Sequence, residues 1–354
     1  MKVGIITINS QNMGNRLQNY AVQEVLKEMG MQVETINNAY CGREVTTFKH
    51  TVKICVQGKT FPSLFRKRRE GFYRFTKKHI QMAEGEWKFG KAPNGICNDY
   101  DFFVCGSDQI WNPNFELVSD NEYLTFARPE QKIAYAASLG VSEMDEEQSA
   151  MLRERVSDFK AISVREDAGA VLVNEACGRS AEVLLDPTMM ILKDKWNAIA
   201  EKPVFLPEKK YILTYFLGKE LPETEKKLQD IARENDWEIV HLWDIQYKKY
   251  FLATPEEFIY LIANCELMCT DSFHGSVFSV LMGVPFIVQM RKDKEKSMNS
   301  RLETLLGKLG LTSHFMTDDM TKEQIFDKDY SEAHVVIEKE KERTKNFLTR
   351  AFDR

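Results

Sequence analysis

The residue types best suited to chemistry gather in one short segment, Thr270 to Ser276, which reads TDSFHGS. The apolar run before it, from Cys265, predicts a buried strand, and the segment then leads into a helix near Phe273. Ligands bind at the carboxyl ends of parallel strands, and a helix amino terminus offers backbone N–H groups and the positive end of the helix dipole. The segment therefore predicts a site for a phosphate or a carboxylate, to which His274 adds a cationic contact or a proton.

The same residues also have a purely structural interpretation. Ser272 is then only the cap of the helix, and His274 is a surface residue beside that cap. The spacing of this single segment does not decide between the two interpretations. The two interpretations make different predictions about the loops that follow the other strands. Only a ligand site requires those loops to be polar as well.

Polar residues do follow three other apolar runs of the chain. They are Asn12, Gly14, Asn15 and Gln18 after the first run, Gly106, Ser107, Asp108 and Gln109 after the second, and Ser163, Val164, Arg165 and Glu166 around the end of the third. A role in a turn or in a helix cap explains each of these loops when it is taken by itself. Because parallel strands end at one edge of a sheet, the loops together predict a polar rim there. Gly14 lets a ligand approach the backbone closely, and Arg165 supplies a guanidinium.

These loops require a scaffold of alternating strands and helices. Val3 to Ile8 predicts a first strand, and the apolar spacing from Leu17 to Met29 predicts a helix that stops at Gly30. Further strands are predicted at Phe102 to Cys105, Ile133 to Ala137, Ala161 to Val164, Val183 to Leu185, Tyr211 to Leu217, Glu238 to Trp243, Glu266 to Thr270 and Pro285 to Gln289. Helices are predicted at Asp145 to Lys160, Glu223 to Asn235, Pro255 to Ala263, Gly275 to Met282 and Ala333 to Phe352. This order is typical of an α/β protein with mostly parallel sheets.

The strands and helices form two successive series. A polar stretch with two prolines, Lys193 to Lys210, predicts a linker between the series. We therefore expect an N-terminal Rossmann-like domain over residues 1–192 and a C-terminal one over residues 205–325. The polar rims are expected to line a cleft between these domains.

Composition and charge narrow the possible functions. The 354 residues are 43% hydrophobic and carry a net charge of -5, so the chain is an ordinary globular protein with no overall attraction to nucleic acid. Its seven cysteines show neither a CxxC pair nor the spacing of a zinc site, which favours buried thiols in a reducing compartment. The first residues read as a strand, and no apolar stretch reaches the roughly 20 residues of a spanning helix. We therefore expect a cytoplasmic protein.

Six short motifs occur in a characteristic order along the chain. They are Asn12-Met13-Gly14 with Leu17-Gln18, Gly106-Ser107-Asp108-Gln109 with Trp111-Asn112, Tyr135-Ala136-Ala137-Ser138, Val164-Arg165-Glu166, Asp186-Pro187-Thr188 and Thr270 to Ser276. Together they resemble the polysaccharide pyruvyl transferase family, and the resemblance extends from residue 1 to Arg301. Asn15, Arg16 and Ser276 depart from the family pattern. The first two lie on the predicted cleft, where they would bear on the choice of acceptor.

The resemblance implies a fold of the glycosyltransferase-B type, in which the last helix, over residues 333–354, returns to the first domain. It also implies that phosphoenolpyruvate is protonated at its methylene carbon, gains a sugar hydroxyl at C2, loses phosphate and closes to a cyclic ketal on a polysaccharide or lipid-linked glycan. This scheme requires no metal, nucleotide or other cofactor. On the acceptor side it points to Asn12, Gly14, Asn15, Ser107, Asp108 and Gln109, and for phosphoenolpyruvate to Arg165, Ser272, His274, Gly275 and Ser276.

Three side chains are expected to carry the reaction. Arg165 suits an anion clamp because its planar fork matches a carboxylate or a phosphate. His274 is expected to hold phosphate and to pass a proton. Asp108 is the predicted base for the acceptor hydroxyl, with Asp271 and Glu166 as competing carboxylates.

Basic residues elsewhere have two interpretations. The segment Lys59 to His79 interleaves basic and aromatic residues, which a solvated helix face explains. The functional alternative is a peripheral contact with the anionic inner face of a membrane or with a lipid-pyrophosphate-linked glycan. Arg291 or Arg301 would add positive charge after the last strand in one interpretation, but a solvated surface position is the expected one for each.

Two other functions stay open at this point. A nucleotide-sugar-dependent glycosyltransferase shares the implied fold, although its donor demands contacts to a base and a ribose that the second domain does not suggest. A non-catalytic subunit of a glycan-assembly complex keeps the fold without the reaction. The presence of both Arg165 and His274 disfavours that alternative.

Overall fold

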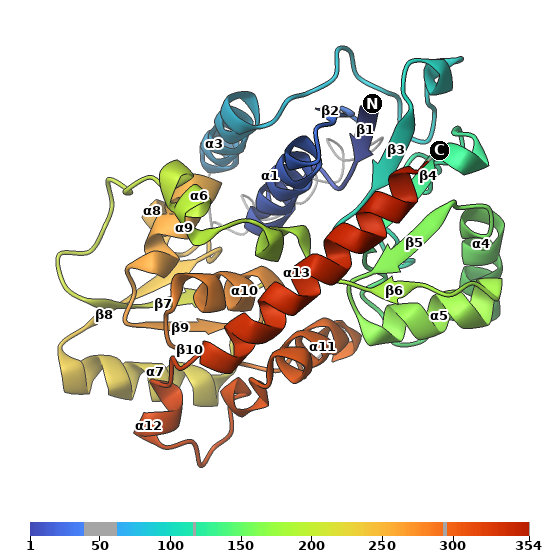
Figure 1. Cartoon of the computed structure of the whole chain (residues 1–354). Helices are drawn as coiled ribbons and strands as arrows, with labels where there is room; N and C mark the ends of the chain where they lie inside the picture. The colour runs from blue at the N-terminus through green and yellow to red at the C-terminus, as the bar shows by residue number, and fades with distance from the viewer. Residues whose placement is uncertain (39–61, 116–117, 293–295, 354) are drawn as a thin grey trace. The chain divides into compact units, whose positions relative to one another are not determined.

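The computed structural model describes residues 1–38, 62–115, 118–292 and 296–353. Contacts within the chain divide it into two units. The described residues of the first unit are 1–38, 76–115, 118–191 and 337–353, and those of the second are 62–75, 192–292 and 296–336. Each unit is built around a parallel sheet (Figure 1).

The sheet of the first unit has six parallel strands in the order β2-β1-β3-β4-β5-β6. The strands are β1 (Lys2–Ile6), β2 (Gln32–Thr35), β3 (Phe102–Cys105), β4 (Lys132–Ala137), β5 (Ala161–Val164) and β6 (Glu182–Val183). All four residues of β3 are buried, as expected for a central strand covered on both faces. The predicted strands of this half are confirmed, except that β6 shares only Val183 with the predicted strand Val183 to Leu185.

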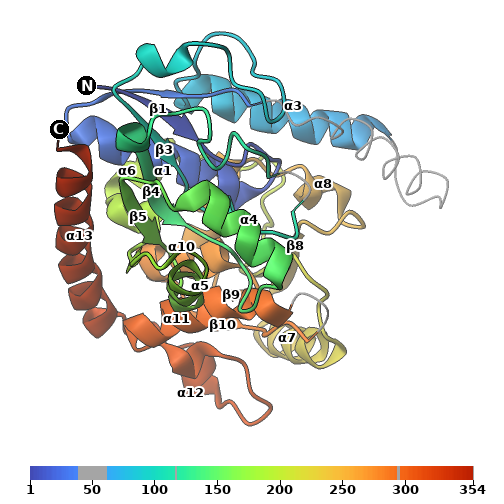
Figure 2. The same cartoon turned by 90° about the vertical axis from the view of Figure 1, so that its right-hand side faces the viewer.

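Three helices of the first unit connect or cover these strands. They are α1 (Met13–Glu28), α4 (Glu146–Val156) and α5 (Asp167–Cys177), accompanied by the short 3-10 turns Ile96–Asn98, Pro129–Gln131 and Pro187–Met190. Asp145 caps α4, because its side chain accepts from the backbone N–H of Gln148 at 2.8 Å. α4 and α5 pack against one another beside β5 (Figure 1, Figure 2).

The sheet of the second unit has the parallel order β10-β9-β7-β8. Its strands are β7 (Tyr211–Tyr215), β8 (Glu238–Leu242), β9 (Leu267–Thr270) and β10 (Phe286–Val288). Its helices are α7 (Pro222–Asn235), α8 (Lys248–Phe251), α9 (Pro255–Ala263), α10 (Phe273–Met282), α11 (Ser300–Leu309) and α12 (Lys322–Ile325). Short 3-10 turns lie at Lys296–Asn299 and Thr312–His314. Ile212 of β7 joins a buried cluster with Leu228 of α7. Tyr215, on the opposite face of the strand, contacts the ring of Phe258 in α9 at 5.0 Å between centroids. Helices therefore cover both faces, and the predicted α/β class with two parallel sheets is confirmed.

The predicted linker is wrong over part of its length. Residues Lys193–Ile199 form a helix, α6. The ring of Trp196 is fully buried and packs edge-on against Phe278 of α10, with 4.9 Å between ring centroids. The burial of this large side chain makes α6 part of the second unit.

Two long helices are divided between the units. In α3 (Pro62–His79), residues 62–75 group with the second unit, where the sequence had suggested the first domain. The reason is visible at Arg68, whose guanidinium lies 4.6 Å from the ring centroids of both Trp243 and Phe251. In α13 (Ser331–Phe352), residues from 337 onward belong to the first unit. Among the described helices, none is long and apolar enough to span a membrane.

Candidate active site

Asp108 is the carboxylate around which the strand-end residues of the first unit gather. It follows β3, and its side chain is 8% exposed. The Nη2 atom of Arg165 lies 3.0 Å from its Oδ1 atom, and the side-chain amide of Asn15 donates to its Oδ2 atom. The backbone N–H of Gln109 also donates to Oδ1, at 2.9 Å. The structure thus brings together Asn15, Asp108 and Arg165, which come from three separate segments of the sequence.

Arg165 is shared between two carboxylates. Its Nη1 atom lies 2.8 Å from Oδ2 of Asp186, whose other oxygen accepts from the backbone N–H and the hydroxyl of Thr188 at 3.0 and 2.6 Å. Burial works against the positive charge, yet the adjacent carboxylates of Asp108 and Asp186 raise the pKa of Arg165 above its ordinary value. The guanidinium is therefore a fixed charge. An anion that bound to Nη1 or Nη2 of Arg165 would displace one of the two carboxylates.

The turn that carries Asp108 is shaped by Gly106. Its φ angle is 119°, and a Cβ atom at this position would collide with the carbonyl oxygen of Tyr135. The buried residue Ser107 follows, and its backbone N–H donates to Oε1 of Gln18 at 2.9 Å. The hydroxyl of Ser107 lies 2.9 Å from Oδ2 of Asp186. A side chain at position 106 would disturb the turn that holds Asp108 beside Arg165.

The other predicted acceptor-side residues hold loops in place. The side chain of Asn12 caps α1 by accepting from the backbone N–H of Gly14 at 2.9 Å. The side-chain oxygen of Gln109 accepts from the amide of Asn112 at 2.6 Å. Their contacts with a sugar stay a prediction.

Glu166 is a brace at the end of β4. It is fully buried, and its Oε1 atom accepts from the hydroxyl of Ser138 at 2.9 Å and from the backbone N–H groups of Leu139 and Gly140 at 2.8 and 3.1 Å. Three donors on one oxygen stabilise the loop. Asp108 also accepts three hydrogen bonds, but its side chain is 8% exposed whereas Glu166 is fully buried, so Asp108 is the more accessible candidate for a base.

In the second unit, Asp271 ties together three strand-end loops. Its carboxylate accepts from the backbone N–H groups of Leu217 and Gly218, each at 2.7 Å, and from Nε of Arg291 at 2.9 Å. The surface position predicted for Arg291 is wrong, because its side chain is only 4% exposed and pairs with Asp271 inside the unit. Arg301 is buried as well, so the same prediction is wrong for it. Asp271 has the bracing role that was one of its two expected roles.

The start of α10 contains the residues of the TDSFHGS segment. Ser272 is the cap, since its side chain accepts from the backbone N–H of Gly275 at 3.4 Å, and the hydroxyl of Ser276 donates to the carbonyl of Ser272 at 3.2 Å. A Cβ atom on Gly275 would lie 2.7 Å from Oγ1 of Thr270, so the helix requires glycine there. His274 is 5% exposed. The structural interpretation is thus right about the cap and wrong about a surface position for His274.

Two titratable residues near β7 and β8, His241 and Glu220, were not predicted from the sequence as site residues. The Nδ1 atom of His241 lies 3.0 Å from Oγ1 of Thr214 and 3.9 Å from Oε2 of Glu220. Burial, with a further contribution from neighbouring carboxylates, raises the pKa of Glu220 to about 7. Burial also lowers the pKa of His241. Glu220 therefore keeps a proton close to neutral pH, which is the property required of a general acid.

The sequence offered different signals for the residues that were missed. Asp186 stands in the Asp-Pro-Thr motif, which marked it as notable without revealing Arg165 as its partner. Glu220 and His241 had no such signal, because they meet only through the pairing of β7 with β8.

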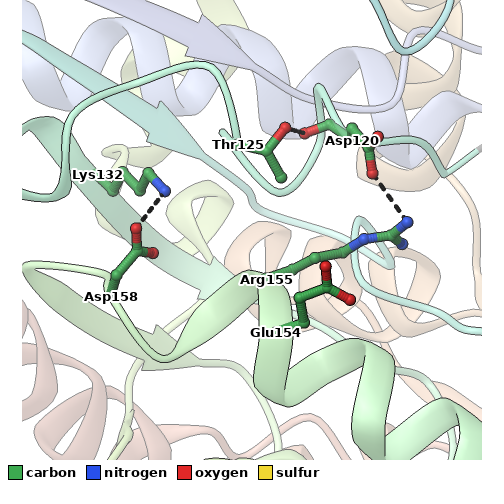
Figure 3. Close-up of a pocket in the computed structure, with 6 residues that line it drawn as sticks. All are labelled: Asp120, Thr125, Lys132, Glu154, Arg155 and Asp158. Carbon is green, nitrogen blue, oxygen red and sulfur yellow. Dashed lines mark hydrogen bonds and ion pairs between the residues drawn. The ribbon is translucent and has the colours of Figure 1, made fainter.

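A cavity of about 360 Å³ lies away from these clusters, at the amino-terminal end of β4 in the first unit (Figure 3). It is lined by Asp120, Thr125, Lys132, Glu154, Arg155 and Asp158. Both of its cations are already paired, Lys132 with Asp158 at 2.7 Å and Arg155 with Asp120 at 2.8 Å. The third carboxylate, Glu154, leaves the lining with one more acid than base, so the cavity lacks the positive charge that would attract an anionic donor. Within the described part of the chain, no group of three or more His, Cys, Asp or Glu residues is arranged to hold a metal ion.

Each unit thus presents one strand-end cluster with its own chemistry. In the first, a carboxylate oriented by Arg165 and Asn15 is suited to accept a proton from a hydroxyl group. In the second, the amino terminus of α10, with His274 in its first turn, suits an anion.

Comparisons with known proteins bear on the family and the fold of the chain. The model of a family described as polysaccharide pyruvyl transferase matches residues 12–288, well over half of the chain. No match was found among curated proteins. The chain is similar to the solved UDP-GlcNAc 2-epimerase of Methanocaldococcus jannaschii, with a TM-score of 0.52, 13% identity and 99% of each chain covered. It is also similar to a putative UDP-N-acetylglucosamine 2-epimerase of Listeria monocytogenes, with a TM-score of 0.54, 12% identity and coverage of 97% of this chain and 90% of that one.

These structural matches concern the fold alone, because the identities are low. They confirm the predicted glycosyltransferase-B type of fold with two Rossmann-like sheets. The extent of the sequence match decides the family: this chain belongs to the polysaccharide pyruvyl transferase family.

Proposed function

We propose that this protein transfers the pyruvyl group of phosphoenolpyruvate to two hydroxyl groups of a sugar in a polysaccharide or lipid-linked glycan. The methylene carbon gains a proton, a first hydroxyl forms a C–O bond at C2, and the bond between C2 and the phosphate oxygen breaks. The second hydroxyl then closes the cyclic ketal. Of the two hydroxyl protons, one balances the proton taken up by carbon and the other leaves with phosphate.

One observation carries the proposal. The segment matched by the family model contains both strand-end clusters, the one around Asp108 and the one at the start of α10. The reaction needs a base for a hydroxyl and a cationic site for an anionic donor. The two clusters supply these two requirements.

Asp108 is the proposed base. Arg165 and Asn15 fix its carboxylate, so an oxygen can be aimed at an acceptor hydroxyl. In this proposal Arg165 is chiefly a positioning residue, because both of its terminal nitrogens are paired with carboxylates. Its predicted contact with phosphoenolpyruvate stays possible only with displacement of one of these partners.

The donor is proposed to bind at the start of α10. His274 would contact the phosphate, and the backbone N–H groups at the amino terminus of the helix would favour its negative charge. Arg291 also lies in this unit, but its charge is balanced by its pairing with Asp271.

Phosphate release in the presence of phosphoenolpyruvate and a glycan acceptor tests the role of His274. We expect His274→Ala to lower the rate by roughly a hundredfold or more, the usual size of a general acid–base contribution. The matched control is His334→Ala, at an exposed position of α13. Near-normal release by His274→Ala, with its fold intact by circular dichroism, would overturn the assignment.

The two competing functions have separate tests. Calorimetric titration with phosphoenolpyruvate and, in parallel, with UDP-N-acetylglucosamine distinguishes a pyruvyl transferase from a nucleotide-sugar enzyme of this fold. Binding of the nucleotide sugar alone would contradict the proposal. Any phosphate release that depends on the protein would exclude a non-catalytic subunit.

A further inference from the structure

Helix α3 turns one half of its surface outward, and that half is strongly basic. The helix covers residues Pro62–His79, and residues 59–61 of the predicted basic segment lie outside the described residues. The exposed residues of the helix are Ser63, Arg66, Lys67, Arg69, Glu70, Tyr73, Arg74, Lys77 and Lys78. At about 100° per residue they fall within one half of the helical circumference. We call this set the basic face.

The opposite half of α3 is anchored. Arg68, Phe72 and Phe75 are buried there. The guanidinium of Arg68 donates to the backbone carbonyl of Phe251 and lies 4.6 Å from the ring centroids of Trp243 and Phe251. The positive charge of Arg68 therefore interacts with residues inside the second unit. The exposed cations of the basic face are a separate set, held in position by this anchored helix.

The charge of the basic face opposes that of the whole chain. Six Lys and Arg residues stand on it against one acid, Glu70, which gives it a local charge of +5 in a chain of net charge -5. Glu70 lies 3.5 Å from Arg66. From Arg66 to Lys78 the cations extend along about 18 Å of the helix at a rise of roughly 1.5 Å per residue. Such a concentration attracts a surface that carries many negative charges.

We propose that the basic face of α3 binds the headgroups of an anionic phospholipid membrane. Lys and Arg side chains reach lipid phosphates while their helix lies flat on the surface. Tyr73, 66% exposed among these cations, has the apolar ring and polar hydroxyl that suit the headgroup region. This inference does not depend on the proposed reaction.

A nucleic acid is the less fitting polyanion. Domains that bind nucleic acid are usually basic as a whole, whereas this chain has a pI of about 5.8. A long polyanion would meet the acidic remainder of the surface as well as the basic face.

Sedimentation of the full-length protein with vesicles tests the proposal. We expect binding to vesicles of phosphatidylcholine mixed with phosphatidylglycerol and little binding to phosphatidylcholine alone, and we expect added salt to weaken it because exposed charges are screened. The triple variant Arg66→Glu, Lys67→Glu and Arg69→Glu should bind at least roughly tenfold more weakly. All three side chains are exposed, so the fold should be unaffected.

The matched control carries the same change of net charge elsewhere. It is the triple variant Lys226→Glu, Lys328→Glu and Lys339→Glu, at three exposed positions of α7, of the loop after α12 and of α13. Retention of binding by this control supports a local site. Equal losses in both triple variants, equal binding to neutral vesicles, or tighter binding to a single-stranded oligonucleotide than to anionic vesicles would each overturn the proposal.

Discussion

At the scale of single residues, the first unit depends on the charge of Arg165. The side chains of Arg165 and Asp186 are almost completely buried, at 1% and 0% exposure, and that of Asp108 is nearly so. Breaking a buried ion pair by removing one partner is far more costly than losing an exposed one, because a charge is left without compensation. The cluster of Asp108, Arg165 and Asp186 is therefore expected to contribute to the stability of the first unit as well as to catalysis.

We expect Arg165→Met to lower the free energy of unfolding by about 3 to 5 kcal/mol, since Asp108 and Asp186 would lose their shared cation. Urea unfolding followed by circular dichroism measures this change. The matched control is Arg155→Met, which breaks a partly exposed pair with Asp120 and should cost about 1 kcal/mol or less. Equal losses in the two variants would show that Arg165 does not balance buried charge.

Glu220 makes the stability of the second unit depend on pH. Its pKa is raised from 4.5 to about 7, first by burial, so the folded protein holds a proton that the unfolded chain releases between these values. Stability contributed by the neutral form is therefore lost as pH rises through that interval. We expect Glu220→Gln to be more stable than the natural protein at pH 8, by roughly 1 kcal/mol for this partly solvated group, and equal to it at pH 4.

Thermal unfolding across this pH range provides the measurement. The control is Glu130→Gln, whose side chain is 67% exposed and should shift stability equally little at both pH values. A Glu220→Gln variant with no gain at pH 8 would mean that the carboxyl group of Glu220 is not destabilised by its surroundings.

At the scale of elements, close packing at strand ends fixes where the helices begin. α10 approaches β9 so closely that Gly275 leaves no room for a side chain beside Thr270. The cap at Ser272 and the hydroxyl of Ser276 then hold the first turn. His274 is buried because it lies within this turn.

Two glycines in helices of the second unit should respond in opposite directions to alanine. Gly275→Ala places a Cβ atom 2.7 Å from Oγ1 of Thr270 and should destabilise by roughly 1 to 3 kcal/mol. Gly307→Ala, in α11, meets no atom within 4 Å and should stabilise by roughly 0.5 to 1 kcal/mol, because alanine favours the helix. Denaturant midpoints of the two variants test this pair. A stabilising Gly275→Ala would contradict the tight approach of α10 to β9.

The sequence predicted strands well where an apolar run was clearly bounded by polar residues. β3 and β9 were expected close to their observed positions because each is a short apolar run bounded by polar residues. α6 was missed because it has seven residues, too few for a clear helical period, and two prolines follow it. The division of α3 between the units was missed too, since the surroundings of Arg68 come from distant residues.

At the scale of the whole molecule, sequence motifs located the strand-end residues but not their partners. Asp108 and Arg165 are 57 positions apart in the chain, and only the order of strands in the sheet brings them into contact. The same holds for Asp271 and Arg291, where the expected surface position was wrong. Local patterns reveal where a strand ends, whereas the pairing of charges depends on topology.

Family membership and the two clusters support one proposal for the protein as a whole, that a pyruvyl group moves from phosphoenolpyruvate to a glycan. Carbon-13-labelled phosphoenolpyruvate tests this claim most directly. After incubation with the protein and a panel of bacterial glycans, we predict labelled carbon in a cyclic ketal on a glycan, detected by NMR, and one phosphate released for each ketal formed. Consumption of a nucleotide sugar, with labelled phosphoenolpyruvate left unchanged, would contradict the account.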